Sequence, residues 1–368
     1  MSRGVAVVGV AESEFGTVPD KTAFQLHVDA AVGALEDSGL QRSDVDGLFS
    51  CGGGGMFPLE LGEYMGITPR YIDSTQVGGS TWELFVQHAV AAIETGQIEV
   101  ALLAYGSTAR SDIKRGSRMG DMPPGGRGPG QFENIHGPTL ISKYAMAAMR
   151  HMHEFGTTAE QLAQVAVDTR YNASLNPLAT FRDPITVDDV LQSRMVADPL
   201  HKLDCCIRTD GGGALLLTTE ERARSLRHKP VRVLGTGGAQ SHVSMSQWPD
   251  FTDLVARHSA EVALRQAGLS ISDIDVFEIY DSFTITVLLS LEALGLCGRG
   301  ESGAFVMDGR MRVGGAMPTN TDGGGLSCNQ PGMRGLFLLI EATRQLRGEA
   351  GERQVPGTPR LALCNGTG

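Results

Sequence analysis

The stretch GGSTWELFVQHAVAAIETG, residues 78–96, is followed almost at once by EVALLAYGS, residues 99–107. The first stretch has a cap-like serine at position 80, good helix formers and a closing glycine, which is typical of an α-helix. The second is a short apolar run, which is typical of a buried strand. A helix that leads directly into a buried strand predicts an α/β protein.

The same alternation continues towards both ends of the chain. VAVVGVA at residue 5 predicts a strand, and VRVLGTGG at residue 231 restarts the pattern of strand and glycine loop. We therefore predict two similar α/β halves, residues 1–225 and 226–368, with functional loops where the strands end. Further strands are expected at 275–280 and 360–366, and helices at 22–37, 251–267 and 336–348.

Residues 107–205 interrupt this alternation. Helical patterns cover residues near 138–155, 158–173 and 187–194, and a turn-rich connector joins the last two. MGDMPPGGRGPGQ, residues 119–131, is too rich in glycine and proline for regular structure, so we expect an ordered excursion or a mobile lid. The whole region is interpreted as an insertion that caps the first half.

The composition excludes several classes of protein. The chain has 368 residues and a net charge of -11, and its basic residues are scattered, which argues against a nucleic-acid-binding surface. No apolar run approaches the roughly 20 residues of a membrane span, and the first residues have no signal-peptide profile. A cytoplasmic protein is expected.

The cysteines and histidines show no metal-binding pattern. The six cysteines are dispersed without a CxxC pair, so neither a zinc site nor a disulfide framework is predicted. His151 and His153 are two residues apart, which places them on different faces of a helix. No metal site is therefore expected.

Several segments, taken in order, resemble the thiolase superfamily, and within it the sterol-carrier-protein-type thiolases and the lipid-transfer-protein aldolases. Besides residues 78–96, they are YAMAAMRHMHEFGTTAEQLAQVAV, ADPLHKLDCCIRTDGGGALLL, FEIYDSFT, GGGLSCNQPGMRG and QLRGEAGERQVPG. The resemblance implies a five-layered αβαβα thiolase fold, a homodimeric core, and a coenzyme A thioester as substrate with no covalently bound cofactor.

The positions that carry catalysis in the family are substituted here. The resemblance places the family's nucleophilic cysteine at Gly79, next to Ser80, and the nearest cysteine, Cys51, lies one loop earlier. Family histidines correspond to Tyr280 and Gln330, and a family cysteine corresponds to Ser282. Acyl transfer through an enzyme thioester is therefore not expected, and Ser80 is interpreted as a helix cap.

The remaining groups can support a retro-aldol cleavage of a β-hydroxyacyl-CoA, with a steroid-like side chain as the substrate that the resemblance suggests. This reaction needs an oxyanion site and two proton transfers, but no acyl-enzyme. Asp281 is interpreted as a cap of the next helix, and Cys205 and Cys206 as core residues. The candidate catalytic residues are Tyr280, Cys328, Gln330 and Cys364, and the candidate substrate-binding residues are Gly79, Ser80, Ser282, Gly324, Gly325 and Gly366.

Two alternatives stay open at this point. One is a non-catalytic subunit that binds acyl-CoA or scaffolds an assembly, and the other is a residual acyltransferase that uses Cys51 or Cys364. The resemblance also implies a small partner protein with an OB fold and a zinc ribbon, so a hetero-complex is expected.

Overall fold

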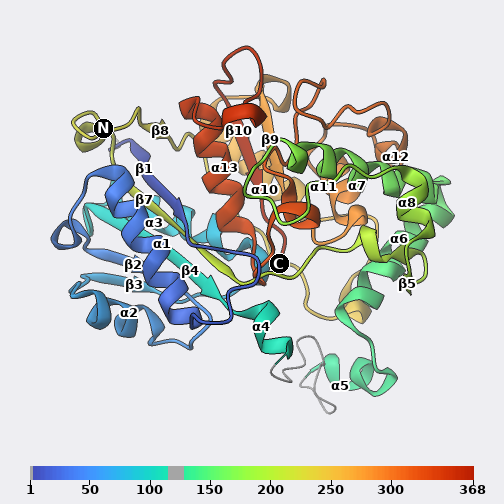
Figure 1. Ribbon diagram of the computed structural model, residues 1–368, viewed down its shortest axis with the longest axis horizontal. Coiled ribbons are helices and arrows are strands. Elements are labelled where there is room, and N and C mark those ends of the chain that lie inside the picture. The colour runs from blue at the N-terminus through green and yellow to red at the C-terminus, as the bar shows by residue number, and fades with distance from the viewer. Residues whose placement is uncertain (1–2, 115–127) are drawn as a thin grey trace.

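The structure is a computed structural model that describes residues 3–114 and 128–368. Helical layers alternate with two sheets (Figure 1). The strands are β1 (Val5–Glu12), β2 (Gly47–Phe49), β3 (Tyr71–Asp73), β4 (Val100–Ser107), β5 (Met195–Ala197), β6 (Leu200–His201), β7 (Gly211–Thr219), β8 (Val231–Arg232), β9 (Val276–Ile279) and β10 (Ala362–Asn365). The α-helices are α1 (Ala23–Ser38), α2 (Phe57–Met65), α3 (Thr81–Glu94), α4 (Ala109–Lys114), α5 (Gly130–Glu133), α6 (Leu140–Phe155), α7 (Ala159–Ser174), α8 (Val187–Gln192), α9 (Glu220–Ala223), α10 (Ala256–Ala267), α11 (Thr284–Ala293), α12 (Ser302–Phe305) and α13 (Gly335–Arg347).

Short helical turns join these elements. They are the 3₁₀ turns η1 (Arg42–Asp44), η2 (Gly78–Ser80), η3 (Asn134–His136), η4 (Lys202–Asp204), η5 (Met245–Gln247), η6 (Ile271–Asp273) and η8 (Gly351–Arg353), and the π-helical turn η7 (Gly324–Cys328).

The first sheet has six strands in the order β3-β2-β4-β7-β1-β8. β2 is parallel to β3 and β4, whereas β7 is antiparallel to both β4 and β1. Alternate residues of β4 face opposite layers: Leu102 packs with α1 and α2, and Leu103 packs with α3 and α13. Because helices cover both faces, the strands are apolar throughout, as expected of a sheet that is buried on both sides.

The five-layered arrangement that was expected is confirmed. α1 and α2 form one outer layer, and α3 and α13 form the central layer between the two sheets. The second sheet contains β9 and β10, which are parallel, with an isolated bridge from Phe277 to Thr319. α7 and α11 pack on its far side, where Ile279 of β9 belongs to the same core as Leu288 of α11.

The strand at residue 231 does not begin the second sheet, contrary to the sequence-based expectation. β8 is antiparallel to β1, with Val231 opposite Val7, so it forms an edge of the first sheet. A short β-branched segment satisfies its backbone at whichever strand edge it reaches, and here that edge belongs to β1.

The insertion packs on the second half, and the prediction that it caps the first half was wrong. Its three helices exist as expected, as α6, α7 and α8. However, Ala148 of α6 and Val165 of α7 share a buried core with Ile285 of α11. The pattern in the sequence correctly gave an apolar helix face, but it carried no information about which half that face would meet.

Most of residues 119–131, for which a lid was considered, lie outside the described residues. No helix in the described parts of the chain combines the length and hydrophobicity of a membrane span. Within the same ranges, no group of three or more potential metal ligands is found.

Candidate active site

Gly79 and Tyr280 lie against each other where the two halves meet. Gly79 belongs to η2, which leads into α3, and Tyr280 directly follows β9. A Cβ atom on Gly79 would overlap the Tyr280 ring and would lie only 2.5 Å from the carbonyl oxygen of Thr367. The ring therefore fills the space that any side chain at position 79 would need.

The Tyr280 hydroxyl accepts two hydrogen bonds. Gln330 donates through Nε2 at 3.1 Å, and the backbone N–H of Arg334 donates at 3.2 Å. Burial raises the pKa of Tyr280 well above its ordinary value, and the hydrogen bond from Gln330 offsets only part of this rise. The side chain is thus a neutral phenol whose own proton is directed away from its two donors.

Hydrogen bonds fix both the backbone and the side chain of Gln330. Its backbone N–H donates to Thr209 Oγ1 at 3.0 Å, and its carbonyl accepts from the Thr209 N–H at 3.1 Å. Its side-chain Oε1 accepts from the N–H of Gly332 at 3.3 Å, which leaves Nε2 facing Tyr280. The structure therefore brings together two of the four predicted catalytic residues.

The N–H groups of Gly324 and Gly325, two candidate substrate-binding residues, donate to carboxylates within the protein. Gly325 donates to Asp281 Oδ1 at 2.7 Å, and Gly324 donates to Asp322 Oδ1 at 2.8 Å. Asp281 consequently does not cap α11, whose N-cap is Phe283. A buried carboxylate needs strong donors, and the backbone of this turn supplies them.

Arg334 completes this buried network. Its guanidinium donates from Nη2 to both Asp322 oxygens at 2.6 Å, and its Nε lies 3.6 Å from Asp281. All three side chains are almost fully buried. The network fixes η7 and, through the Arg334 backbone, one of the two donors to Tyr280.

Cys328 lies in a different environment from Tyr280. It packs in a small cluster with Ala173 and Ala179, and the Asn176 amide lies 3.5 Å from its sulfur. Burial raises the pKa of the Cys328 thiol well above its ordinary value. These contacts describe a buried thiol that fills space beside α7.

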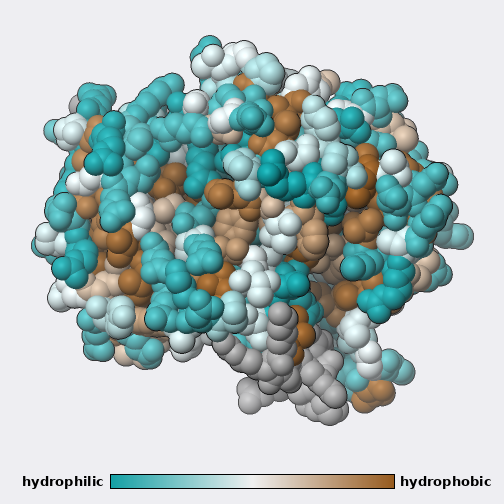
Figure 2. Space-filling view, viewed as in Figure 1, coloured by the Kyte–Doolittle hydropathy of each residue, from teal (hydrophilic) through white to brown (hydrophobic). Residues whose placement is uncertain are grey.

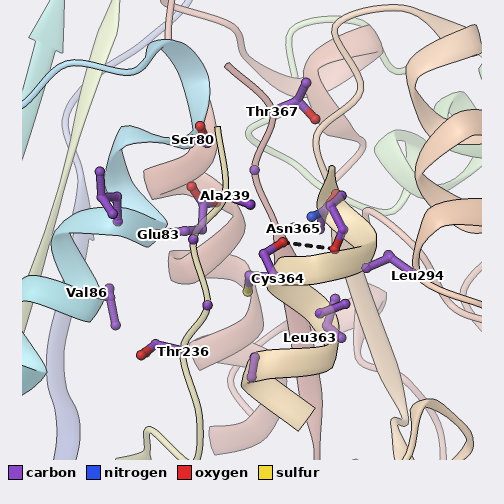
Figure 3. Close-up of a pocket in the computed structure, with 18 of the residues that line it drawn as sticks. Ser80, Glu83, Val86, Thr236, Ala239, Leu294, Leu363, Cys364, Asn365 and Thr367 are labelled. Atoms are coloured by element: carbon purple, nitrogen blue, oxygen red, sulfur yellow. Dashed lines mark hydrogen bonds between the residues drawn. The ribbon is translucent and has the colours of Figure 1, made fainter. Parts of the chain in front are cut away.

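Cys364 and Gly366 line a groove of about 1000 Å³ beside the central helices (Figure 3). In that view Ser80, Glu83 and Val86 of the α3 segment lie on one side, and Leu363 and Cys364 of β10 lie on the other. Burial raises the pKa of Cys364 well above its ordinary value. Towards the middle of the face in Figure 2, apolar residues collect in the hollows, whereas the rim is mostly hydrophilic.

Ser80 occupies the N-cap position of α3, but its side chain does not cap the helix. Its hydroxyl donates to the carbonyl of Val77 at 3.2 Å instead. The expected capping hydrogen bond is therefore replaced by one that closes the preceding turn.

Comparisons with known proteins agree with this arrangement. A family profile described as Thiolase C-terminal domain-like matches residues 237–368. The chain is 34% identical to the acetyl-CoA acetyltransferase of Methanothermobacter thermautotrophicus, over 96% of this chain and 94% of that protein. It is also 34% identical to the steroid side-chain-cleaving aldolase of Thermomonospora curvata, over 99% of this chain and 95% of the aldolase.

A third relative and a solved structure extend these matches. The 17-hydroxy-3-oxo-4-pregnene-20-carboxyl-CoA lyase of Mycobacterium tuberculosis is 32% identical over 100% of this chain and 97% of its own length. The chain belongs to the thiolase superfamily. Among solved structures, the Ltp2-ChsH2(DUF35) aldolase matches with a TM-score of 0.88 and 32% identity, over 98% of this chain and 94% of that one.

The chemistry of this thiolase-superfamily chain is restricted by the environment of its cysteines. Cys51, one possible substitute nucleophile, is buried in the core between the first sheet and α3. Burial raises the pKa of Cys51 to about 12, and the nearby Asp73 adds to this rise. A thiol that stays protonated at neutral pH is a poor nucleophile.

Two residues lie beside Tyr280 in the site of this thiolase-superfamily protein that the sequence did not indicate as functional. Cys206 was interpreted as a core residue, and Tyr144 was not singled out. Burial raises the pKa of Cys206 to about 12, and interaction with the Gln330 side chain opposes part of this rise. Tyr144 lines the groove and packs on Phe283 with ring centroids 4.5 Å apart. The predicted residue Ser282 shares a hydrogen bond with Thr286, whose hydroxyl oxygen lies 3.0 Å from its own. Cys206 and Tyr144 are recognised only by their position next to Tyr280, and that position is known only once the fold is known.

Glu83 is the third missed residue and the most unusual one in chemical terms. It lies on α3 four residues after Gly79, and both of its carboxyl oxygens are buried without a hydrogen-bond partner among the described residues. Burial raises the pKa of Glu83 to about 8. In the sequence Glu83 looks like an ordinary residue of an amphipathic helix, so nothing there distinguishes it.

Proposed function

We propose that this protein is a lyase that cleaves a β-hydroxyacyl-CoA by a retro-aldol reaction, giving a ketone or aldehyde and a shorter acyl-CoA. One observation carries the proposal: Tyr280 fills the space beside Gly79, where the resemblance places the family's nucleophilic cysteine. A site without a nucleophile cannot form an acyl-enzyme, but it can still stabilise an enolate.

In this mechanism Tyr280 serves as a hydrogen-bond donor to the enolate oxygen. The phenol oxygen accepts hydrogen bonds from Gln330 and the Arg334 backbone, so its own proton remains available for donation. As the C–C bond breaks, the electron pair moves to the α-carbon and the thioester oxygen, and the β-oxygen becomes the carbonyl of the first product. The phenol would then stabilise the negative charge that develops on the thioester oxygen.

Acyl transfer is the alternative that the acetyltransferase relative raises. It is disfavoured because Gly79 admits no side chain while Tyr280 keeps its place. Cys51 and Cys364 are both thiols whose pKa burial raises. Intact mass after incubation with acetyl-CoA tests this alternative directly, and the lyase proposal expects no acyl adduct.

The substrate class follows from the two lyase relatives, whose names specify a steroid side chain and a pregnene carboxyl-CoA. We extend this to the present chain as a bulky, steroid-like acyl group. The groove of about 1000 Å³ beside β10, lined by α10 and by Leu289 of α11, is consistent with a large apolar ligand.

The assembly is proposed on similar grounds. A structure that matches this chain is named as an aldolase of two components, one of them DUF35. We infer a small OB-fold partner for this chain as well, together with a homodimeric core. β3 is an edge strand of the first sheet, and edge strands pair readily with a second chain.

The test is a direct assay of product release. The protein, co-expressed with its OB-fold partner, is mixed with 17-hydroxy-3-oxo-4-pregnene-20-carboxyl-CoA, and products are identified by mass spectrometry. A ketone and a shorter acyl-CoA in equal amounts are expected. Binding of the thioester without any cleavage would instead support the non-catalytic, acyl-CoA-binding role.

A further inference from the structure

The carboxyl group of Glu83 lies against two glycines. A Cβ atom on Gly335 or on Gly366 would overlap the Glu83 carboxyl group, and one on Gly366 would also lie 2.7 Å from Ser80 Cα. Gly335 begins α13 and Gly366 follows β10, so two elements distant in sequence leave room for the same side chain. A side chain at either glycine position would therefore collide with the carboxyl group.

The surroundings of this carboxyl group offset little of the cost of its burial. Neither oxygen has a hydrogen-bond partner within residues 3–114 and 128–368. Burial raises the pKa of Glu83 to about 8, and its own backbone N–H opposes the shift only in part. The Cys364 thiol of β10 interacts with this carboxyl group. The Arg334 side chain, from the residue before Gly335, is directed to Asp281 and Asp322.

A structural role does not explain such a residue. An unpaired buried carboxyl group destabilises a fold, and glutamine or leucine would fit the same helix position at lower cost. Groups of this kind are concentrated at sites where protons move.

The position of Glu83 is also suited to chemistry. It is one helical turn after Gly79, and it lines the groove together with Ser80 and Gly366. The Tyr280 hydroxyl is bound by the backbone of Arg334, and the next residue, Gly335, touches Glu83. The phenol and the carboxyl group therefore border consecutive residues at the start of α13.

We propose that Glu83 is the proton shuttle of the lyase, and this proposal rests on the retro-aldol function proposed above. The ionised carboxylate takes the proton of the substrate β-hydroxyl as the C–C bond breaks. The same proton is then delivered to the α-carbon of the enolate, which forms the new C–H bond and restores the carboxylate. One group thus serves both transfers, and no oxidant, reductant or co-reactant is needed.

The experiment compares the wild type with Glu83→Gln, in complex with the partner. Glu94→Gln, an exposed position at the end of the same helix, is the matched control. Turnover of the pregnene carboxyl-CoA and unfolding by urea are both measured between pH 5 and pH 9. Wild-type turnover should rise with pH through an apparent pKa near 8, and Glu83→Gln should lower it by about 10²- to 10⁴-fold.

Unfolding tests the buried acid without any substrate. Between pH 4.5 and about 8 the folded protein holds a proton on Glu83 that the unfolded chain has released, so wild-type stability should fall as pH rises across this range. Glu83→Gln removes this dependence, and its urea midpoint should exceed that of the wild type by a margin that widens towards pH 8. Glu94→Gln should follow the wild type in both measurements.

The outcomes separate the two proposals. If Glu83→Gln turned over substrate at the wild-type rate and with the wild-type pH dependence, the shuttle would be overturned and the lyase function would remain. Absence of turnover in the wild type, with the expected unfolding behaviour, would overturn the lyase function and the shuttle role with it. Identical pH dependence of unfolding in the wild type and Glu83→Gln would show that Glu83 is not a neutral buried acid, and this would also reject the shuttle.

Discussion

Gly79 and Tyr280 depend on each other, because the ring of one occupies the side-chain space of the other. The hydroxyl of Tyr280 accepts two hydrogen bonds, one from the Gln330 side chain and one from the backbone N–H of Arg334 just before α13. A side chain at position 79 and the phenol at position 280 therefore exclude each other. Each residue can be tested alone and with its neighbour.

Tyr280→Phe removes only the proton donor and keeps the ring beside Gly79. We expect turnover to fall by about 10²- to 10³-fold, as when one oxyanion donor is removed, with little change in coenzyme A thioester binding. Steady-state kinetics and calorimetric titration measure the two effects. Tyr64→Phe, on an exposed tyrosine of α2, is the control and should retain normal turnover.

Gly79→Ala introduces a Cβ atom where the Tyr280 ring stands. We expect a loss of about 1–3 kcal/mol in the free energy of unfolding, which is typical of overpacking. The loss should shrink in a Tyr280→Ala background, where the ring is absent, so a double-mutant cycle should give a coupling energy. Strict additivity of the two substitutions would contradict the contact.

Residue identities in the site were partly predictable. The resemblance located Tyr280 and Gln330, and the structure places them within hydrogen-bonding distance. Cys206 and Glu83 could not be found in this way, because their unusual environments are built by Gln330, Gly335 and Gly366, which are distant in sequence. Burial and lack of partners are properties of the fold, and no local pattern encodes them.

Among the elements, four helices begin where a threonine side chain caps them, and one loop is fixed by buried charges. α1, α6, α7 and α8 all start after a threonine whose side chain accepts from the backbone of the third helical residue. These boundaries were predicted within two residues, since the helical pattern in the sequence is local. The turn η7 was not predictable, because Asp281, Asp322 and Arg334 determine it through tertiary contacts.

Thr158→Ala removes the capping box of α7, in which Thr158 and Gln161 exchange hydrogen bonds. We expect the free energy of unfolding to fall by about 1 kcal/mol, with turnover unchanged, since α7 lies behind the site. Urea denaturation measures the loss. Thr68→Ala, on an exposed threonine outside the helix caps, should leave the midpoint unchanged, and an equal loss there would refute the capping explanation.

The whole molecule is held together by layers that share cores across large distances in sequence. The alternation of strands and helices predicted these layers, because a sheet buried on both faces needs helices on each side. It did not predict that α6 and α7 pack on the second half, or that β8 joins the first sheet. Both depend on which of several similar apolar faces come together.

The buried pair of His151 and Glu292 joins the insertion to α11 and should make the fold sensitive to acid. Burial opposes ionisation of Glu292, but hydrogen bonds from His151 at 3.0 Å and Ser302 at 2.6 Å outweigh it and hold the pKa of Glu292 below its ordinary value. Its contribution to stability is therefore present above pH 4.5 and is lost as pH falls through the folded pKa.

Glu292→Gln tests this dependence. At pH 7 it should be less stable than the wild type by about 1.5–3 kcal/mol, the usual range for a hydrogen bond to a charged group. The difference should narrow as pH falls below 4.5, because the unfolded chain then binds a proton that the folded carboxylate still lacks, and it should be smallest below the folded pKa. Urea titrations at pH 7 and pH 3.5 measure it, and a difference that is equal at both pH values would contradict an ionised Glu292 carboxylate.

The contact between Gly79 and Tyr280 also limits how such a protein could change its chemistry over evolutionary time. A cysteine at position 79 would meet the Tyr280 ring, so the ring would have to become smaller before a nucleophile could be gained. The intermediate would then possess neither the phenol nor the thiol. A change to acyl transfer by single substitutions would thus pass through an inactive intermediate. The contact between Gly79 and Tyr280 therefore makes such a change difficult.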